Sequence, residues 1–388
     1  MVDSTLKKKI LLINCDWRNL FQNNPHELWE KLERDRLCPD QNDFFIFSWA
    51  KQDYVDEYRN WKTVHKKTSM FWFKPWFDLM SWFVIPKVVK AQAVAPEVIV
   101  VYDFGFLPTA YRLRKLYGSK IVMVINNMPR LYSAVRSFGW IKSLYSRFLE
   151  WRYKHVPDEY FTINDAMKTY LRHLGIPEKH IHMFAMDTIN RDMKYIAESK
   201  QGVIRSQYGI PANAKVLICV ARLEAEKGYD RLLDLFATLE KDCYLIILGE
   251  GSLREPLEKQ IQKHHMQDRV FMPGFIRRDQ IWNYYQDADV FVLLSKVEAL
   301  GVVVWEAMYM CVPVIGSTAP GIVESTGWNG ERGFVLRDDE GEKQFKALLD
   351  KCVARDDEQS ATRCKMLHAA QAYVEKKITN TLTLNDIV

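Results

Sequence analysis

The stretch Ser295-Lys-Val-Glu-Ala-Leu-Gly-Val-Val-Val-Trp-Glu-Ala-Met308 holds two glutamates, Glu298 and Glu306, eight positions apart. The apolar run 290–294 precedes it and predicts a buried strand, and a second apolar run, 312–315, follows. A strand that passes through a glycine-containing turn into a helix is where α/β proteins bind ligands, and the N–H groups at the helix start favour anions. Glu306 falls about two helical turns beyond Glu298, so the two carboxylates can meet different parts of one extended ligand.

The length and composition of the chain indicate a globular protein with two domains. Its 388 residues are too many for one compact core, and 48% hydrophobic with 27% charged residues is ordinary for a folded protein. Its seven cysteines are scattered and form no Cys-x-x-Cys pair, which favours a reducing compartment and argues against a structural zinc site. The first residues show no signal-peptide pattern, so we expect a cytoplasmic protein.

Short apolar runs alternate with helical patterns in both halves, which predicts an α/β fold with two doubly wound domains. The runs are 10–14, 44–47, 98–102, 121–125, 160–164, 216–220, 244–248, 270–272, 290–294, 313–315 and 333–336. The polar stretch 190–206 is the expected linker. We therefore predict a first domain over 1–195, a second over 203–365 and a tail over 366–388, with packing of the tail on the first domain left open.

Two cations follow the first strand of the second half. Arg222 and Lys227 flank a turn into a helix, and Gly228 lets the backbone turn tightly. Two cations at a helix start suit a diphosphate, although a solvated loop with surface charges explains them better when they are taken alone. After the next strand, Gly249 and Gly251 permit close approach of a ligand to the backbone, but the third glycine of a dinucleotide fingerprint is missing.

The order of these motifs resembles that of retaining glycosyltransferases of the GT-B fold, family 4 (glycosyl transferases group 1). The resemblance is strong over about 203–355, and in the first half it rests on strand order and on 162–171. The motifs, in chain order, are Arg222, Lys227-Gly228, Gly249-x-Gly251, Gly274-Phe-Ile276, Glu298-x7-Glu306 and Pro313-Val-Ile315. It implies two Rossmann-like domains facing a central cleft, with the donor in the second domain and the acceptor in the first.

The resemblance also implies roles for individual residues. Arg222 and Lys227 would hold the donor diphosphate and stabilise the leaving nucleotide as negative charge develops. Glu298 would face the donor sugar, and Glu306 would accept hydrogen bonds from the ribose hydroxyls. The remaining donor contacts would come from the backbone around Gly249, Gly251, Ile276, Ala299, Leu300 and Gly301.

Protein cations at the diphosphate would make a metal ion unnecessary. Asp287-Ala-Asp289 spells a DxD motif, but it leads into a strand, and we interpret it as structural. The chain also departs from the family pattern: Cys311 stands in place of a glycine, and Asn126 stands in place of a first-domain histidine. Asn126 and Asp103 are the catalytic candidates of the first domain. Asp103 would orient the acceptor hydroxyl, with capping of a turn as an equal alternative.

The segment 61–154 is basic and aromatic. It holds 16 Lys and Arg against 4 Asp and Glu, and six of the twelve tryptophans. This composition suits contact with an anionic membrane surface, although packing in the core or the cleft explains part of it. Nucleic acid ranks below lipid because no nucleic-acid-binding motif is present. The residues expected at the membrane are Trp72, Trp76, Trp82, Trp140, Lys142 and Arg147.

These observations favour a retaining, metal-independent glycosyltransferase of hexosyltransferase type, peripheral on the cytoplasmic face of a membrane. Its donor would be a nucleotide diphosphate sugar, UDP-sugar before GDP-sugar, and its acceptor a membrane-associated, lipid-linked glycan. Two alternatives stay open. One is a non-catalytic subunit that binds a nucleotide sugar and supports a partner, and the other is a different GT-B enzyme such as a phosphorylase or an epimerase.

Overall fold

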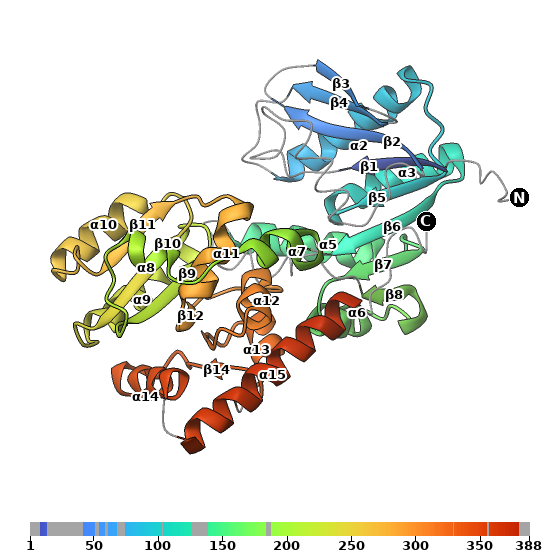
Figure 1. Ribbon diagram of the computed structural model, residues 1–388. Helices are drawn as coiled ribbons and strands as arrows, with labels where there is room; N and C mark the ends of the chain where they lie inside the picture. The colour runs from blue at the N-terminus through green and yellow to red at the C-terminus, as the bar shows by residue number, and fades with distance from the viewer. Residues whose placement is uncertain are drawn as a thin grey trace, which may run out of the picture. The chain divides into compact units, whose positions relative to one another are not determined.

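The computed structural model describes residues 8–13, 42–50, 54–58, 61–67, 74–102, 104–125, 139–183, 188–328, 330–354 and 357–379 (Figure 1). The chain divides into two compact units, the first formed by 1–187 with 381–388 and the second by 188–380. Within the described residues each unit has its own predominantly parallel sheet with helices packed on it. The α/β fold class predicted from the sequence is confirmed.

The sheet of the first unit has, over its described residues, eight strands in the order β3-β4-β2-β1-β5-β6-β7-β8. Five of them correspond to predicted apolar runs: β1 (Lys8–Ile13), β2 (Asn42–Ala50), β5 (Val98–Val101), β6 (Lys120–Ile125) and β7 (Glu159–Thr162). The sequence did not reveal β3 (Tyr54–Tyr58), β4 (Trp61–Lys67) and β8 (Ile181–Met183). The pair β3–β4 is antiparallel, whereas the other pairs are parallel. β3 and β8 are the two edge strands and β4 lies next to β3, and all three carry mixed polar and apolar residues, which explains why their pattern was missed.

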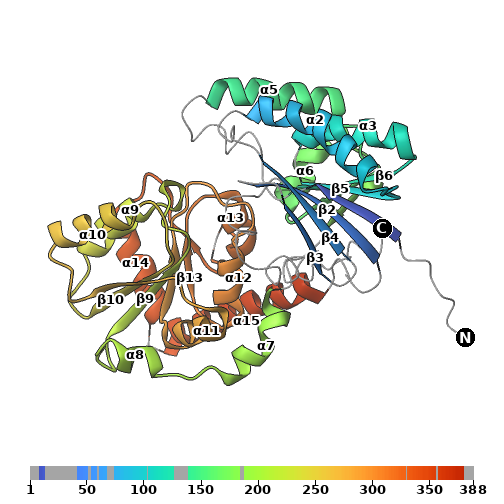
Figure 2. The same cartoon turned by 90° about the horizontal axis from the view of Figure 1, so that it is seen from above.

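Three helices of the first unit, α2 (Lys74–Ala91), α3 (Leu107–Tyr117) and α5 (Gly139–Tyr153), lie side by side against one face of the sheet (Figure 2). Their buried apolar side chains join those of the strands in a single core. The helix α6 (Asp165–His173) begins after its N-cap residue Asn164, whose Oδ1 accepts a hydrogen bond from Met167 N at 2.7 Å. Among the described helices, none has the length and hydropathy that a membrane span requires.

The sheet of the second unit is entirely parallel over its six described strands, in the order β11-β10-β9-β12-β13-β14. These strands are β9 (Lys215–Val220), β10 (Cys243–Leu248), β11 (Val270–Gly274), β12 (Val290–Leu293), β13 (Val314–Gly316) and β14 (Phe334–Val335). The chain builds outward from β9 in one direction and from β12 in the other. In a doubly wound sheet, ligands bind outside the carboxyl ends of the strands at such a reversal of order, here between β9 and β12.

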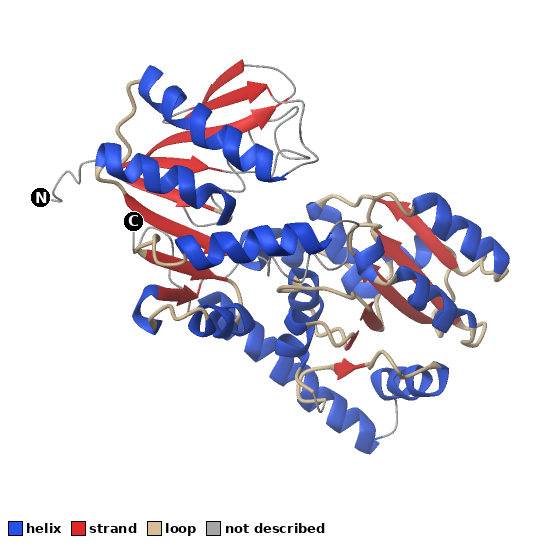
Figure 3. Ribbon diagram, turned by 180° about the vertical axis from the view of Figure 1, so that it is seen from behind, coloured by secondary structure: helices blue, strands red, loops and turns tan. Residues whose placement is uncertain are grey.

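Helices lie on both faces of this second sheet (Figure 3). They bury large side chains, among them Phe236, Trp282 and Trp305. The helices between the strands are α9 (Tyr229–Ala237), α10 (Arg254–Lys263), α11 (Arg278–Asp287), α12 (Val302–Tyr309), α13 (Pro320–Thr326) and α14 (Glu342–Val353), with a short 3-10 helix η3 (Ala225–Lys227) after β9.

The unit boundary differs from the predicted one. The second unit starts at 188, whereas the prediction ended the first domain at 195. The stretch 190–206, which is polar and was predicted as a linker, forms most of α7 (Thr188–Glu198) and the start of α8 (Val203–Gln207), and both helices pack on α11. Residues 366–379 of the predicted tail belong to α15 (Asp357–Thr379), which packs on α12, α13 and α14 of the second unit.

Candidate functional site

An ion pair between Lys227 and Glu298 lies at the reversal of strand order in the second sheet. Lys227 ends η3 in the loop after β9, and Glu298 lies in the loop after β12. The distance from Lys227 Nζ to Glu298 Oε2 is 2.7 Å, and the two side chains are 12% and 15% exposed. A nearly buried pair of this kind depends on both partners, because removal of one leaves an uncompensated charge. The structure therefore brings together two predicted site residues that are 71 positions apart in sequence.

Backbone contacts hold the loops after β9 and β12 against each other. Lys296 N donates to Glu226 O at 2.7 Å. Gly228 has a φ of +69°, and a Cβ on it would lie 2.0 Å from Leu294 O, so no other residue fits this turn without displacement. The predicted tight turn at Gly228 is thus present, and it is set by contact with the end of the neighbouring strand.

Gly249, after β10, approaches the backbone of a neighbouring loop closely. A Cβ on it would lie 2.0 Å from Ala221 O, and one on Gly251 would lie 2.4 Å from Leu223 O. These glycines were predicted to allow close approach of a ligand, and in the structure they allow close approach of one loop to the next. The second predicted cation, Arg222, has a 61% exposed side chain that lies 3.3 Å from Glu226 Oε1. Arg222 is therefore accessible from solvent, unlike Lys227.

The backbone residues that were predicted to contact the donor lie at the start of α12. Gly301 is the N-cap residue of this eight-residue helix, and its carbonyl accepts a hydrogen bond from Val304 N at 2.7 Å. Glu298, Ala299 and Leu300 form the turn before it, and the Glu298 carbonyl accepts from Gly321 N at 3.0 Å. Ala299 is partly exposed, whereas Leu300 and Gly301 are buried. The turn and helix start predicted from the opening stretch are thus present.

Glu306 lies on the buried side of α12, where its side chain is 1% exposed. Its Oε1 accepts a hydrogen bond from Arg278 Nη1 at 2.8 Å, and its Oε2 accepts from the Tyr285 hydroxyl at 2.9 Å. Arg278 also donates through Nε to Asp192 Oδ2 at 2.7 Å. The predicted ribose-binding carboxylate therefore belongs to a buried network of four residues.

Burial and charge act in opposite directions on this network. Burial raises the pKa of Glu306 above its ordinary value, and the nearby Arg278 cation and the Tyr285 hydroxyl offset part of this effect. Burial lowers the pKa of Arg278, but Glu306 and Asp192 outweigh it and hold that pKa above its ordinary value. Burial, followed by the charge of Glu306, raises the pKa of Tyr285 well above its ordinary value. Arg278 is thus the fixed positive charge between two buried acids.

Asp287 and Asp289, the residues of the DxD motif, both accept hydrogen bonds from other parts of the second unit. Asp287 accepts hydrogen bonds from the backbone N–H groups of Gly202, Ile204 and Arg205 at the start of α8. Asp289 accepts from Val216 N and from Arg205 Nη2, each at 2.7 Å. The structural interpretation of this motif agrees with these contacts.

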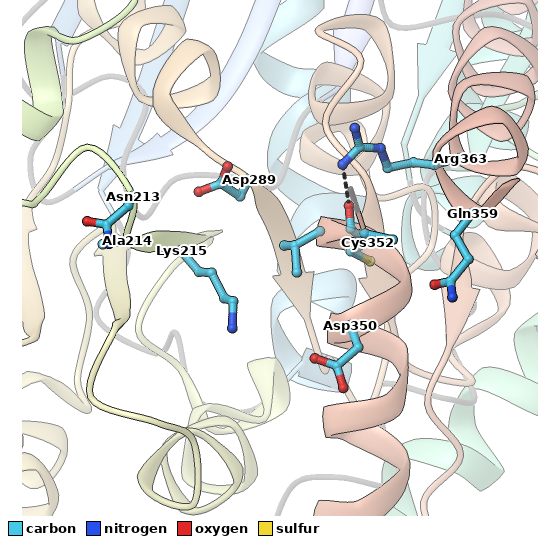
Figure 4. A pocket seen from close by; sticks show the side chains of 10 residues that line it. Asn213, Ala214, Lys215, Asp289, Asp350, Cys352, Gln359 and Arg363 are labelled. Atoms are coloured by element: carbon cyan, nitrogen blue, oxygen red, sulfur yellow. Dashed lines mark hydrogen bonds between the residues drawn. The ribbon is translucent and has the colours of Figure 1, made fainter. Parts of the chain in front are cut away.

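A cavity of about 640 Å³ lies beside Asp289, at the amino ends of the strands. Lys227 and Glu298 follow the carboxyl ends of the strands instead. Lys215, at the amino end of β9, and Asp350, on α14, line it together with Arg363 on α15 (Figure 4). Arg363 Nη1 donates to the Cys352 carbonyl at 3.1 Å. The cavity is therefore separate from the predicted donor residues, which follow the carboxyl ends of the strands.

The structure describes only some of the site residues predicted in the first domain. Asp103 and Asn126 lie outside the described residues, as does Trp72, and the side chains of Trp76, Trp140 and Lys142 are not described. Trp82 is half-buried, with the Arg112 guanidinium 5.4 Å from its ring centroid. Arg147 is exposed on α5. The acceptor side of the predicted site and much of the expected membrane set therefore stay predictions.

Sequence reasoning missed Arg278, Tyr285 and Asp192. A signal for Arg278 existed, since Arg277-Arg278 directly follows the Gly274-Phe-Ile motif and opens a helix. Tyr285 had none, because an aromatic residue in an amphipathic helix is usually part of a core. Asp192 lies in the stretch that its polarity marked as a linker.

Comparison with known proteins relates this chain to glycosyltransferases, by sequence in the second unit and by fold along the chain. Residues 200–366 match the family model described as glycosyl transferases group 1. The chain is 29% identical over 154 residues to alpha-D-kanosaminyltransferase of Streptomyces kanamyceticus, which is 39% of this chain and 40% of that protein. It is 27% identical over 146 residues to alpha-monoglucosyldiacylglycerol synthase of Streptococcus pneumoniae, which is 37% of this chain and 33% of that protein. The alignments thus span less than half of these relatives' lengths.

Two solved structures resemble the whole fold. A sucrose-phosphate synthase from Thermosynechococcus elongatus has a TM-score of 0.74 at 18% identity, covering 96% of this chain and 95% of its own. HepE of Anabaena, in complex with UDP and glucose, has a TM-score of 0.68 at 17% identity, covering 96% of this chain and 95% of its own. Residues 200–366 therefore resemble the family glycosyl transferases group 1, and the chain has the fold of GT-B glycosyltransferases.

Proposed function

We propose that this protein is a retaining glycosyltransferase that moves a sugar from a nucleotide diphosphate sugar to a membrane-associated, lipid-linked glycan. UDP-sugar is the favoured donor and GDP-sugar the next. The observation that carries the proposal is the Lys227–Glu298 pair at the reversal of strand order, where doubly wound sheets bind ligands. HepE, which shares the fold, is described in complex with UDP and glucose, and this supports a UDP-sugar donor.

The proposed chemistry uses the charges of the pair directly. The bond between the anomeric carbon and the donor phosphate oxygen breaks, a bond to the acceptor oxygen forms, and the acceptor hydroxyl gives its proton to the leaving diphosphate. Negative charge then develops on the leaving diphosphate, where Lys227 and the more exposed Arg222 would stabilise it. Glu298 would orient both the Lys227 ammonium and the hydroxyls of the donor sugar. This arrangement makes a metal ion unnecessary for the leaving group.

The proposed membrane contact rests on two helices of the first unit. On α5, Leu144, Phe148 and Trp151 are 58%, 54% and 72% exposed, and they follow one another at helical spacing. On α2, Leu79 and Phe83 are 48% and 52% exposed. Exposed large apolar side chains at this spacing are typical of helices that lie in a bilayer interface.

Charge supports an anionic bilayer as the partner of these helices. The carboxylates of α2 and α5 are Asp78 and Glu150, which are 3% and 1% exposed. Basic residues are exposed instead: Lys87 and Lys90 on α2, and Arg147 and Arg152 on α5. Each basic residue near an anionic leaflet contributes about 1 kcal/mol of binding. One relative named for a diacylglycerol product is consistent with a lipid-linked acceptor.

The test is a panel of UDP-, GDP- and ADP-sugars incubated with membrane extract, with release of the nucleotide as the measurement. We expect release from one donor, unchanged by EDTA, and its loss in Glu298→Ala. The control variant is Glu255→Ala, because Glu255 is exposed and pairs with Lys259 on the surface of α10. Donor binding without release would instead support the non-catalytic subunit, and release that requires inorganic phosphate would support a phosphorylase.

A further inference from the structure

Arg278 covers two buried acids of the second unit. Its side chain is 33% exposed, whereas those of Glu306 and Asp192 are each 1% exposed. Arg278 also lies over the Trp282 ring, with 5.2 Å between the guanidinium carbon and the ring centroid. Of these three charged side chains, Arg278 is therefore the one that solvent reaches. This matters because the family resemblance assigns ribose binding to Glu306 alone.

The chemistry of a ribose diol matches an ion pair better than a lone carboxylate. Each hydroxyl both donates and accepts a hydrogen bond. A carboxylate can only accept hydrogen bonds from the hydroxyl O–H groups. A guanidinium beside it can donate to the hydroxyl oxygens. Arg278 Nη1 and Glu306 Oε1 lie 2.8 Å apart, which is close enough for neighbouring hydroxyls of one ribose to contact both groups.

We propose that the ribose end of the donor site is the Arg278–Glu306 ion pair, positioned by Asp192, rather than Glu306 alone. The inference rests on the proposed function, since it assumes a nucleotide donor. It adds to that function a specificity residue, Arg278, and a positioning residue, Asp192. Asp192 holds the Nε edge of the guanidinium at 2.7 Å and leaves Nη1 directed at Glu306.

The surroundings of Glu306 explain why it needs Arg278. The charged and titratable groups that face it are Arg278 and Tyr285 from α11 and Asp192 from α7. Arg278 supplies the positive charge, because Tyr285 is neutral and Asp192 is an acid. Without Arg278, burial would raise the pKa of Glu306 further, because the cation that offsets part of the burial effect would be gone. Glu306 would then contribute less to ribose recognition, while the phosphate contacts would remain.

The test compares the affinities of UDP and GDP with those of their 2′,3′-dideoxy forms, measured by calorimetry on the full chain. In wild type we expect the ribonucleotide to bind at least about tenfold more tightly. In Arg278→Met this ratio should fall to about two or less, with the affinity for the dideoxy form unchanged. Arg278→Lys should restore part of the ratio, and the neighbouring, exposed Arg277→Met should leave it unchanged.

Two outcomes would overturn the inference: a wild-type ratio in Arg278→Met, or an equal loss of affinity for both forms, which indicates a purely structural role. If Arg278→Met does not fold, Asp192→Asn carries the test, since it keeps the guanidinium but weakens its anchor. It should lower the ratio about threefold, and an unchanged ratio would overturn the inference. Failure of wild type to bind any nucleotide would refute the proposed function itself, which is a separate result.

Discussion

Lys227 and Glu298 come from loops that follow neighbouring parallel strands, and their charged groups are 2.7 Å apart. The contact lies at the carboxyl ends of the strands, where the strand order of the second sheet reverses. Since both side chains are mostly buried, we expect a change in either one to affect both the stability of the protein and the proposed chemistry.

Lys227→Met should therefore affect both properties. We expect proposed transfer to fall by about 100-fold or more, because the leaving diphosphate loses its buried cation. The free energy of unfolding should drop by about 1–3 kcal/mol, because Glu298 stays without its partner. Nucleotide release and urea unfolding measure the two effects. Turnover near that of wild type would remove Lys227 from the site, whatever its effect on stability.

Gly228→Ala tests the contact between the two loops. The new Cβ would lie 2.0 Å from Leu294 O on a residue with a φ of +69°, so the loop after β9 must shift. We expect a loss of about 2–4 kcal/mol in the free energy of unfolding. Gly209→Ala is the matched control, because Gly209 has a φ of +63° with nothing within 4 Å of its Cβ position, and it should cost about 1 kcal/mol. Equal losses in the two variants would contradict the proposed crowding.

Glu306→Gln should change how stability depends on pH. Burial raises the pKa of Glu306 above its ordinary value of 4.5, so the folded state binds the proton more tightly than the unfolded state. The stabilisation from this proton is complete below pH 4.5 and is lost as the pH rises through the folded-state pKa. Relative to the Gln variant, wild type should therefore lose stability as the pH increases from 4.5. Urea unfolding across this range measures the difference, which would stay constant if Glu306 titrated normally.

Replacing Leu144, Phe148 and Trp151 together by Ser should release the protein from vesicles that contain phosphatidylglycerol. These side chains form the exposed apolar face of α5 between basic residues. The control replaces three exposed apolar residues of the second unit, Val203, Phe275 and Trp328, and should leave vesicle binding unchanged. Co-sedimentation with and without the anionic lipid is the measurement. If wild type does not bind vesicles, the proposed membrane contact is wrong.

The predicted elements succeed where the sequence pattern is local and strong. The strand at 290–294, the turn at 295–301 and the helix that carries Glu306 all appear, because continuous apolar runs and a glycine N-cap act over a few residues. The pattern failed at the edge strand β3 and at β4 beside it, because both carry mixed polar and apolar residues. It also failed for 190–206, where a polar composition concealed two helices that bury one side each.

The sequence by itself determined that Glu298, Lys227 and Gly228 follow strand ends, because hydrophobic runs and turn residues specify local structure. It could not determine which of these ends are neighbours, since strand order depends on long-range packing. Tertiary structure alone decided that Lys227 meets Glu298 and that Arg278 joins Glu306 to Asp192. A buried charge must find its partner in space, and the folded core, rather than the spacing along the chain, determines which partner is within reach.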